Sequence, residues 1–387
     1  MAIVINGSGT VTGISVGGLP DGIVDAGTLA TNSVDSAELI DGAVDDSHMA
    51  SISGRKNMII NGAMTVSQRN GTTDTTVASG AIYTIDRWKL GGSQSSKLSV
   101  QQSTVAPTGF KNSAKITVQS AVSIGNGDYF GLCTDLEGQD VAHLSFGSAS
   151  AQQVTLSFWV RSSLTGTFGF ALREQCAGSS RSYATNYAIS SADTWEKKTI
   201  TISGDESGTW STDNTAGLGF WFDLGSGSDF HGSANTWEGA NDNTTSGTVS
   251  VIGTGSATWY ISGVQLELGS VATDFEHRTY GEELYLCQRY YESTPALDAA
   301  TSARQQICFG SGALQGLHFD VRKRAVPTVV VYGRTGVAGS VSNINSGGVT
   351  TSCAAENIVT DGCHYISGSG FTTGVSYEVN YSADAEL

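Results

Sequence analysis

Apolar and polar residues alternate along many short segments of this chain, as in strands with one buried face. In the clearest segment, 259–268, Val264 and Leu266 alternate with Gln265 and Glu267. The same pattern occurs at 58–60, 97–102, 115–119, 154–161, 168–173, 197–202 and 217–224. Gly, Ser and Asn clusters separate these segments, and regular short strands between turns favour a β-sandwich or jelly roll.

The pattern changes after residue 269. Leu284, Cys287, Gln288 and Tyr291 recur every three or four residues, which predicts one face of a short helix. One domain therefore ends and another begins between 259 and 292.

A second, smaller β domain is predicted towards the C-terminus, from about residue 303. Strands are expected at 316–321, 327–333 and 375–381, with long loops at 334–350 and 352–374. These segments predict a small all-β knob with long loops.

A ten-residue repeat precedes the sandwich. Its three units begin at Val24-Asp25, Val34-Asp35 and Val44-Asp45, and each has Leu29, Leu39 or Met49 five residues later. Each unit has too few apolar residues to bury against itself, so stacked neighbours are needed. A parallel homotrimer would supply them, with residues 1–21 as the attachment end. A flexible Gly/Ser/Asp linker is the alternative.

Composition narrows the functional classes. Only 14% of residues are charged, 49 are Gly, and the net charge is −16, which argues against a nucleic-acid-binding surface. No apolar run is long enough to span a membrane, and the start of the sequence lacks a secretion-signal pattern, so synthesis in a cytosol is expected. The six cysteines form no CxxC pair and are interpreted as reduced and buried; Cys353 with Cys363 is the one bridge considered.

Three pieces of sequence carry a family resemblance: RKNMIINGAM with YTIDRW, QLELGSVATDFEHRTYGEELYLCQRYYE, and the terminal YSADAEL. Together they resemble phage tail-fibre and receptor-binding proteins, which implies a virion adhesin. NMIINGAM and WYISGVQLEL also look like the first and last strands of jelly-roll carbohydrate-binding modules. That family often places an acidic residue after the Asn-Gly to bind a structural calcium. Ala63 stands there in this chain, so no cofactor is expected, and a structural calcium is the lesser alternative.

All seven tryptophans lie between residues 88 and 259. Alternation places Trp159 and Trp221 on the outer side of their strands, and a flat aromatic ring suits stacking on a sugar. If their strands share a sheet with 259–268, both rings lie on one amphipathic face with Arg161, Asp223, Gln265 and Glu267. Such a face has three interpretations: a subunit or domain interface, a glycan-binding platform, or ordinary surface.

Trp210 and Trp237 lie instead in turn-rich loops among Asn and Asp, which suits sugar recognition at the rim of a sandwich. Packing as loop anchors is the equal alternative. In the C-terminal loops, Arg334, His364, Tyr365 and Phe371 are candidates for contact with a receptor, since the C-terminal end is the distal tip in the fibres that this chain resembles.

No sequence motif indicates an enzyme. Carboxylates are plentiful, but no spacing singles out the pair that glycoside hydrolysis needs, and the histidines are isolated from one another.

We therefore expect an elongated, all-β homotrimeric fibre. Its parts are an attachment and repeat segment (1–54), a jelly-roll domain (55–279), a helix and connector (280–302) and a C-terminal β-sandwich knob (303–387). The expected function is a bacteriophage tail fibre in the virion. Its N-terminus would attach to tail or baseplate proteins, and its distal domains would bind host polysaccharide or lipopolysaccharide without catalysis. A structural virion connector is the main alternative, and a glycan depolymerase ranks after it.

Overall fold

The computed structural model describes residues 4–5, 11–12, 56–78, 80–294, 306–309, 313–334, 336–344, 346–372 and 374–387. The chain divides into two compact units, Met1–Gly54 and Arg55–Leu387. In the first unit, β1 (Val4–Ile5) pairs antiparallel with β2 (Val11–Thr12). The predicted repeat lies outside the described residues.

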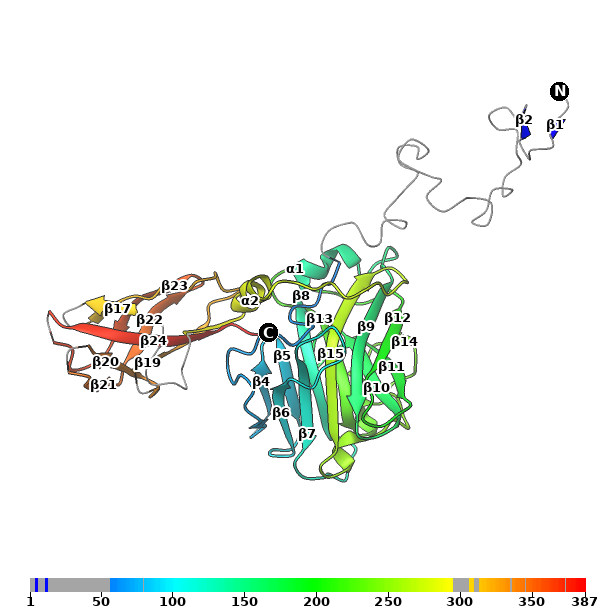
Figure 1. The fold of residues 1–387 in the computed structure, drawn as a ribbon, viewed down its shortest axis with the longest axis horizontal. Helices are drawn as coiled ribbons and strands as arrows, with labels where there is room; N and C mark the ends of the chain where they lie inside the picture. Colours follow the sequence, from blue (N-terminus) through cyan, green and yellow to red (C-terminus); the bar gives the residue numbers. More distant parts are fainter. Residues whose placement is uncertain are drawn as a thin grey trace. The chain divides into compact units, whose positions relative to one another are not determined.

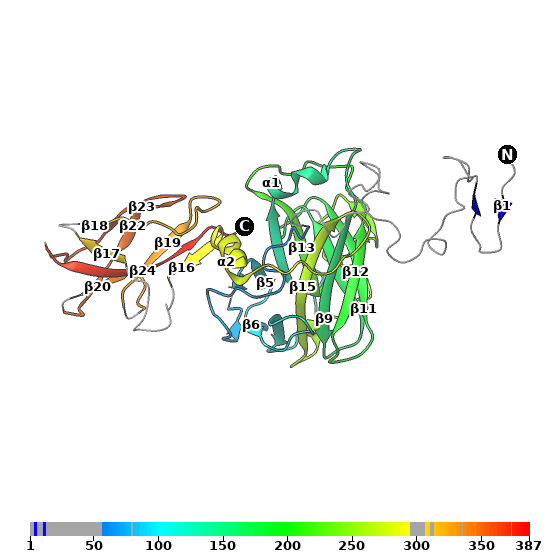
Figure 2. The same cartoon turned by 45° about the horizontal axis from the view of Figure 1, so that its top comes forward.

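The second unit contains an open β-sandwich, which confirms the all-β prediction (Figures 1 and 2). We name its two sheets after a central strand of each. The β13 sheet consists, in spatial order, of β14 (Thr236–Glu238), β11 (Ser182–Ile189), β10 (Gly166–Arg173), β13 (Ala216–Ser226), β8 (Tyr129–Glu137), β5 (Trp88–Gly92) and β4 (Ala81–Ile85). The β9 sheet consists of β12 (Glu196–Ile202), β9 (Val154–Ser162), β15 (Thr258–Leu268), β7 (Ser113–Val118), β6 (Leu98–Ser103) and β3 (Thr75–Thr76).

The chain passes repeatedly between the two sheets. From β7 in the β9 sheet it crosses to β8, returns to β9, and crosses again to the hairpin of β10 and β11. All strand pairings in the sandwich are antiparallel. Strands distant in sequence are therefore neighbours in each sheet, and the two inner faces enclose one core.

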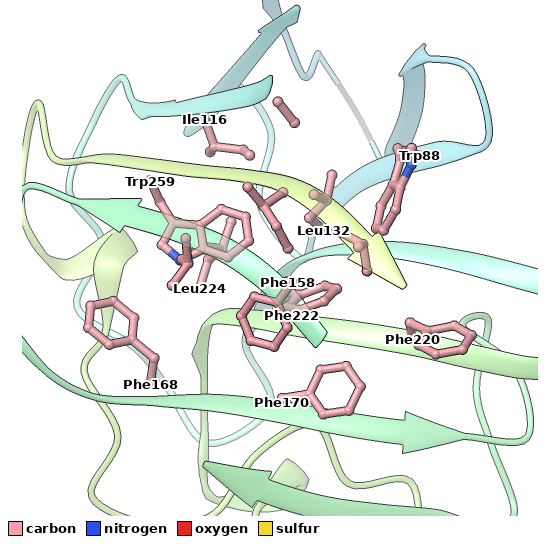
Figure 3. Packing of buried hydrophobic residues seen from close by; sticks show 14 of the residues in the cluster. Trp88, Ile116, Leu132, Phe158, Phe168, Phe170, Phe220, Phe222, Leu224 and Trp259 are labelled. Atoms are coloured by element: carbon pink, nitrogen blue, oxygen red, sulfur yellow. The ribbon is translucent and has the colours of Figure 1, made fainter. Parts of the chain in front are cut away.

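Aromatic rings from both sheets fill that core (Figure 3). Phe158 of the β9 sheet lies 5.2 Å from Phe222 of the β13 sheet, and Trp259 lies 5.9 Å from the same ring. All three side chains are 0% exposed. Burial of each such side chain is worth about 1.5–3 kcal/mol, so this contact is a main source of sandwich stability.

Alternation located β6, β7, β9, β12 and β15 of the β9 sheet and β10 and β13 of the other sheet. It missed β3 in the β9 sheet and β4, β5, β8, β11 and β14 in the β13 sheet. β8 is almost wholly buried because other segments cover its outer side, so polar Thr134 and Asp135 are as inaccessible as Leu132. Apolar and polar residues therefore do not alternate regularly along β8.

The strand predicted at 58–60 is wrong. Asn57 and Asn61 replace strand pairing there with side-chain hydrogen bonds. Oδ1 of Asn57 accepts from the backbone N–H groups of Ile59 and Leu266, while Asn61 adopts φ 57° and its amide binds the carbonyls of Val66 and Asp86. Asn tolerates this left-handed conformation better than most residues.

The predicted helix exists as α2 (Tyr280–Gln288), and the Thr279 side chain caps its N-terminus by accepting from the N–H of Glu282. Tyr291 is not on the helix; it lies on β16 (Tyr291–Ser293). The other helical turns are short and connect strands of the sandwich: α1 (Gly138–Val141), η1 (Ala142–Leu144), η2 (Ser228–Phe230) and η3 (Val251–Gly253).

The C-terminal part of this unit forms two further sheets. One is built around β24 (Ser376–Asp384), and its other strands are β16, β17 (Gln306–Phe309), β19 (Thr328–Tyr332), β20 (Ser340–Asn343) and β21 (Val349–Thr351). The second contains β18 (Ala313–Gln315), β23 (Gly362–Ser367) and β22 (Ala354–Val359).

Two predictions for this region need correction. The expected long loops contain hairpins, β20 with β21 and β22 with β23. The predicted strand at 316–321 is also wrong: Leu317, Phe319 and Val321 are buried as expected, but their backbone forms no strand. The segment of the β20–β21 hairpin is rich in Gly, Ser and Asn and lacks the apolar stripe that marks a strand, which explains why alternation missed this hairpin.

Cys133, Cys176, Cys287, Cys353 and Cys363 are buried, and none of these five forms a disulfide with another of them. The Cys353–Cys363 bridge is therefore absent, and burial raises the pKa of both thiols. Within the described part of the chain, no helix has the length and apolar character needed to cross a bilayer.

Candidate functional site

Trp159 projects from β9 on the outer side of the β9 sheet and is half-buried. Its ring lies beside that of Phe110, and both lie over Gly263 at the bulge of β15. A Cβ at Gly263 would lie 2.6 Å from Phe110 Cζ and 3.1 Å from Trp159 Cδ1. Only glycine leaves room for the two rings, and its φ of 61° also favours glycine.

A row of aromatic and cationic side chains runs beside Trp159, across neighbouring strands. Arg161 of β9 pairs in register with Tyr260 of β15, which pairs with Lys115 of β7. The Arg161 guanidinium lies 5.0 Å from the Tyr260 ring centre, and the Trp195 ring meets Tyr260 edge-on at 6.1 Å. Strand pairing thus fixes which groups are neighbours.

On the other side, Lys197 of β12 is the register partner of Trp159 and is exposed. We use "the Trp159 face" for this surface, which consists of Phe110, Lys115, Trp159, Arg161, Trp195, Lys197 and Tyr260. It joins half-exposed indole rings to hydrogen-bond donors, the combination that binds the apolar and polar parts of a sugar.

Part of the outer side of the β9 sheet is covered. The segment 270–278 packs there: Gln265 donates to the carbonyl of Asp274 and accepts from the N–H of Glu276, and Glu267 accepts from the N–H of Thr273. Gln265 and Glu267 are consequently buried. The prediction that they share an open surface with Trp159 is wrong, because the chain that follows β15 folds back over them.

Trp221 and Asp223 do not belong to the Trp159 face. They lie on β13, in the other sheet, and Trp221 is 4% exposed. Its ring covers Gly131, meets Tyr129 at 6.0 Å and lies under the Arg173 guanidinium at 5.4 Å. The expected exposed platform at Trp221 is therefore wrong, and the premise that its strand shares a sheet with Trp159 fails.

Asp223 is fully buried beside this ring. Its Oδ1 accepts from Ser226 at 2.5 Å, whereas Oδ2 has no hydrogen-bond partner among the described residues. Burial raises the pKa of Asp223 to about 7, because desolvation disfavours the charged carboxylate.

Trp210 and Trp237 form a cluster with Phe146. Ring centres are 5.0 Å apart for Phe146 and Trp210, and 5.4 Å apart for the two tryptophans. Each indole N–H donates to a backbone carbonyl, Trp210 to Ser207 and Trp237 to Ser203. These contacts hold the loops against the core, as expected of loop anchors.

The four candidates in the C-terminal domain have different environments: two contact other side chains of the domain and two are exposed. Arg334 forms a two-point ion pair with Glu378, at 2.8 and 2.5 Å, and Phe371 packs on Tyr377 at 5.2 Å. Both are thus engaged within the domain. His364 and Tyr365 are exposed on β23, Tyr365 at 38%. They are the aromatic groups that the C-terminal domain offers from the predicted set.

The three sequence pieces that carry the family resemblance meet at a buried polar junction between the sandwich and the β24 sheet. Arg87 pairs with Glu386, stacks on Tyr290 at 3.5 Å, and donates to the carbonyl of Asp135. Arg87 is 1% exposed and Glu386 is 4% exposed. Burial opposes the charge on Arg87, but the Glu386 carboxylate, together with Tyr290 and Tyr83, outweighs it and raises the pKa of the guanidinium.

Further pairs extend the junction. Arg69 stacks on Tyr291 at 3.6 Å and pairs with Asp384 at 3.0 Å. Arg289 binds Glu137 through two contacts of 2.7 Å. Burial raises the pKa of Asp86, beside Arg69, to about 6. Each motif supplies part of this network, so the resemblance marks residues that join two domains.

The described residues contain no group of three or more His, Cys, Asp and Glu side chains suited to a metal ion. One carboxylate pair, Glu238 and Asp242, lies near a pocket of about 580 Å³ lined by His231, Ser233 and Glu238. Burial and the neighbouring Glu238 raise the pKa of Asp242.

Sequence reasoning did not select Lys115, Trp195, Lys197 or Tyr260 as site residues. Lys115 and Lys197 alternate along their strands with residues that are more buried, so the outward direction of these two side chains could be read from the sequence. Their grouping could not, because it depends on the β12–β9–β15–β7 strand order, which sequence spacing does not reveal.

No protein-family model matches the chain, and no curated protein matches it. Among solved structures, the enzymatically active domain of bacteriophage CBA120 tailspike protein 4 is 13% identical with a TM-score of 0.29; the match covers 55% of this chain and 21% of that one. The family 11 carbohydrate-binding module of Clostridium thermocellum, in complex with a mixed-linked tetrasaccharide, is 13% identical with a TM-score of 0.27, covering 51% of this chain and 100% of the module. A xylan-binding domain of Paenibacillus barcinonensis is 15% identical with a TM-score of 0.28, covering 53% and 99%. Similarity at this level assigns no family, ligand or activity to this chain.

Proposed function

We propose that this protein is a non-catalytic glycan-binding protein and that the Trp159 face is its binding site. The observation that carries the proposal is the half-buried Trp159 ring, held beside Phe110 over Gly263 and flanked by Arg161 and Lys197. An indole fixed in this way presents an apolar face without losing further side-chain freedom on binding, and the flanking donors can bind hydroxyl groups.

We further propose that the glycan belongs to a bacterial surface and that the protein is a phage tail fibre. The sequence pieces that resemble tail-fibre proteins support this role. The ten-residue repeat supports a homotrimer, with the jelly-roll-like sandwich and a C-terminal knob distal to an N-terminal attachment segment. Three sites on each fibre would raise the effective concentration of a weak site.

The structural connector is the second candidate. The buried junction favours it, because Arg87 and Glu386 fix two domains together, as a connector under load requires. A connector would retain the junction but would not bind glycans.

The test uses the intact chain on an array of bacterial surface polysaccharides, with Trp159→Ala beside the wild type. We expect the wild type to bind at least one polysaccharide and the variant to lose roughly ten-fold or more in affinity, as for a stacked aromatic contact. If the wild type binds none of the polysaccharides on the array, the structural-connector function is supported instead. Release of new reducing ends from a bound polysaccharide would overturn the non-catalytic assignment.

A further inference from the structure

The cations of the Trp159 face contrast with the rest of the molecule. The chain has 36 acidic and 20 basic residues, giving a net charge of −16. Arg161, Lys115 and Lys197 nevertheless gather on the outer side of the β9 sheet.

The arrangement interleaves rings with cations. Lys197 is opposite Trp159, and both Arg161 and Lys115 are opposite Tyr260 on adjacent strands. Neighbouring strands are about 4.8 Å apart, so each ring has a cation one strand away. A group stacked on a ring would therefore place its substituents within reach of a positive charge.

Two of the three cations are not neutralised locally. Arg161 pairs with Asp193 at 3.1 Å, and that aspartate side chain is 57% exposed. Among the described residues, no acidic side chain pairs with Lys115 or Lys197 at salt-bridge distance, although neighbouring Lys198 pairs with Glu196 at 2.6 Å. The nearby acidic group Glu267 is buried under Thr273, which removes it from this surface.

From this geometry we propose that the Trp159 face is selective for anionic glycans, whose sugars carry carboxylate or phosphate groups. The inference rests on the proposed function, because it names the ligand class of the same site. The sugar ring stacks on Trp159, and its acidic substituent pairs with Lys197. Lys115 and Arg161 form ion pairs with the acidic substituents of the sugars that follow in the polymer. The negative charge elsewhere on the protein repels an anionic polymer, which confines binding to this face.

The experiment measures binding of the immobilised intact protein to polygalacturonate, alginate and hyaluronan, each compared with its carboxyl-reduced form. Reduction converts the carboxylates to neutral hydroxymethyl groups and leaves the sugar backbone in place. We expect tighter binding to the charged form of at least one pair, with an affinity that falls as the salt concentration rises.

Three variants of the intact chain identify the responsible groups. Lys197→Gln and Lys115→Gln should each weaken binding to the charged form roughly two- to five-fold, the range of exposed ion pairs, and weaken binding to the reduced form by less. Arg322→Gln is the matched control, since it removes one exposed cation from the C-terminal part, where it contacts Thr360. It should change neither affinity.

The outcomes separate this inference from the proposed function. Equal binding of the charged and reduced forms, or equal effects of Lys197→Gln and Arg322→Gln, overturns the selectivity. If neutral glycans still bind and Trp159→Ala abolishes that binding, the proposed function stands alone. Binding of no polysaccharide of either kind overturns both.

Discussion

The buried junction gives the sharpest test of the architecture, through the substitution Glu386→Gln. In the native protein the Glu386 carboxylate neutralises Arg87, whose side chain is 1% exposed, and also contacts Arg69 at 3.3 Å. Glutamine has nearly the same shape but no charge, so the variant leaves the Arg87 cation buried without its main counter-charge.

The size of the stability loss depends on the contacts that Arg87 and Arg69 keep in the variant. Removing one partner of a buried ion pair costs about 3–5 kcal/mol. Glutamine keeps one oxygen acceptor for Arg87, the Tyr290 ring still stacks on it, and Arg69 retains Asp384. We therefore expect a loss near the lower end, about 3 kcal/mol in the free energy of unfolding.

Urea denaturation followed by tryptophan emission measures this loss in the sandwich, since all seven tryptophans lie between residues 88 and 259. The matched control is Asp384→Asn in the same terminal segment. That carboxylate is 44% exposed, so its pair with Arg69 should contribute no more than about 1 kcal/mol. Equal unfolding midpoints for Glu386→Gln and Asp384→Asn would refute the view that the C-terminal residues stabilise the sandwich through Arg87.

Three further predictions concern the site, a buried acid and the assembly. Gly263→Ala should displace Trp159 and Phe110 and abolish glycan binding, whereas Gly269→Ala, with φ 93° and open space around it, should keep binding; equal binding of the two variants would contradict the packing argument. Asp223→Asn should stabilise the protein at pH 8 by roughly 1–3 kcal/mol, with the gain vanishing near pH 4. Asp223 binds its proton more tightly in the folded protein, so the free energy of unfolding of the wild type falls as pH rises from 3.8 to about 7. A difference in urea midpoints between wild type and Asp223→Asn that does not change with pH would exclude the titration of Asp223 as the cause. Sedimentation equilibrium should give three times the chain mass of 40.1 kDa, and a monomer would contradict the trimer.

The junction also determines how the domains can be studied. A cut between residues 280 and 281 would separate Arg87 from both Tyr290 and Glu386, and would remove the Glu283 carboxylate that accepts from the N–H of Asn61 at 2.6 Å. Isolated halves would thus expose charged groups that are buried in the whole chain. Point variants in the intact protein avoid this problem.

Sequence reasoning succeeded where a strand buries one face against a single core. In β9, alternation correctly placed Phe158 inside and Trp159 outside. It failed where both faces are buried, as in β13: Phe222 points into the core as expected, but Trp221 is covered on the other side. Periodicity gives a side chain's direction; what covers it depends on chain segments distant in sequence.

The candidate site shows the same limit. The outward direction of Trp159 and Arg161 was predictable, while the separation of Trp221 from them depends on which strands pair. The family resemblance identified important residues, yet it did not reveal that Arg87, Tyr290 and Glu386 lie together at a domain junction. The position of Trp221 and the meeting of Arg87, Tyr290 and Glu386 both depend on contacts between residues distant in sequence, which local spacing does not reveal.

The central claim is that the Trp159 face binds glycan, and its direct test compares Trp159→Ala with Tyr365→Ala in the intact protein. Both aromatic side chains are partly exposed, one on the sandwich and the other on β23 of the C-terminal domain. Binding of each variant to the polysaccharide that the wild type recognises should be measured by titration calorimetry, with circular dichroism to verify folding. The account predicts that Trp159→Ala loses at least roughly ten-fold in affinity and that Tyr365→Ala binds like the wild type. Normal binding by Trp159→Ala together with lost binding by Tyr365→Ala would contradict it and place recognition at the C-terminal domain.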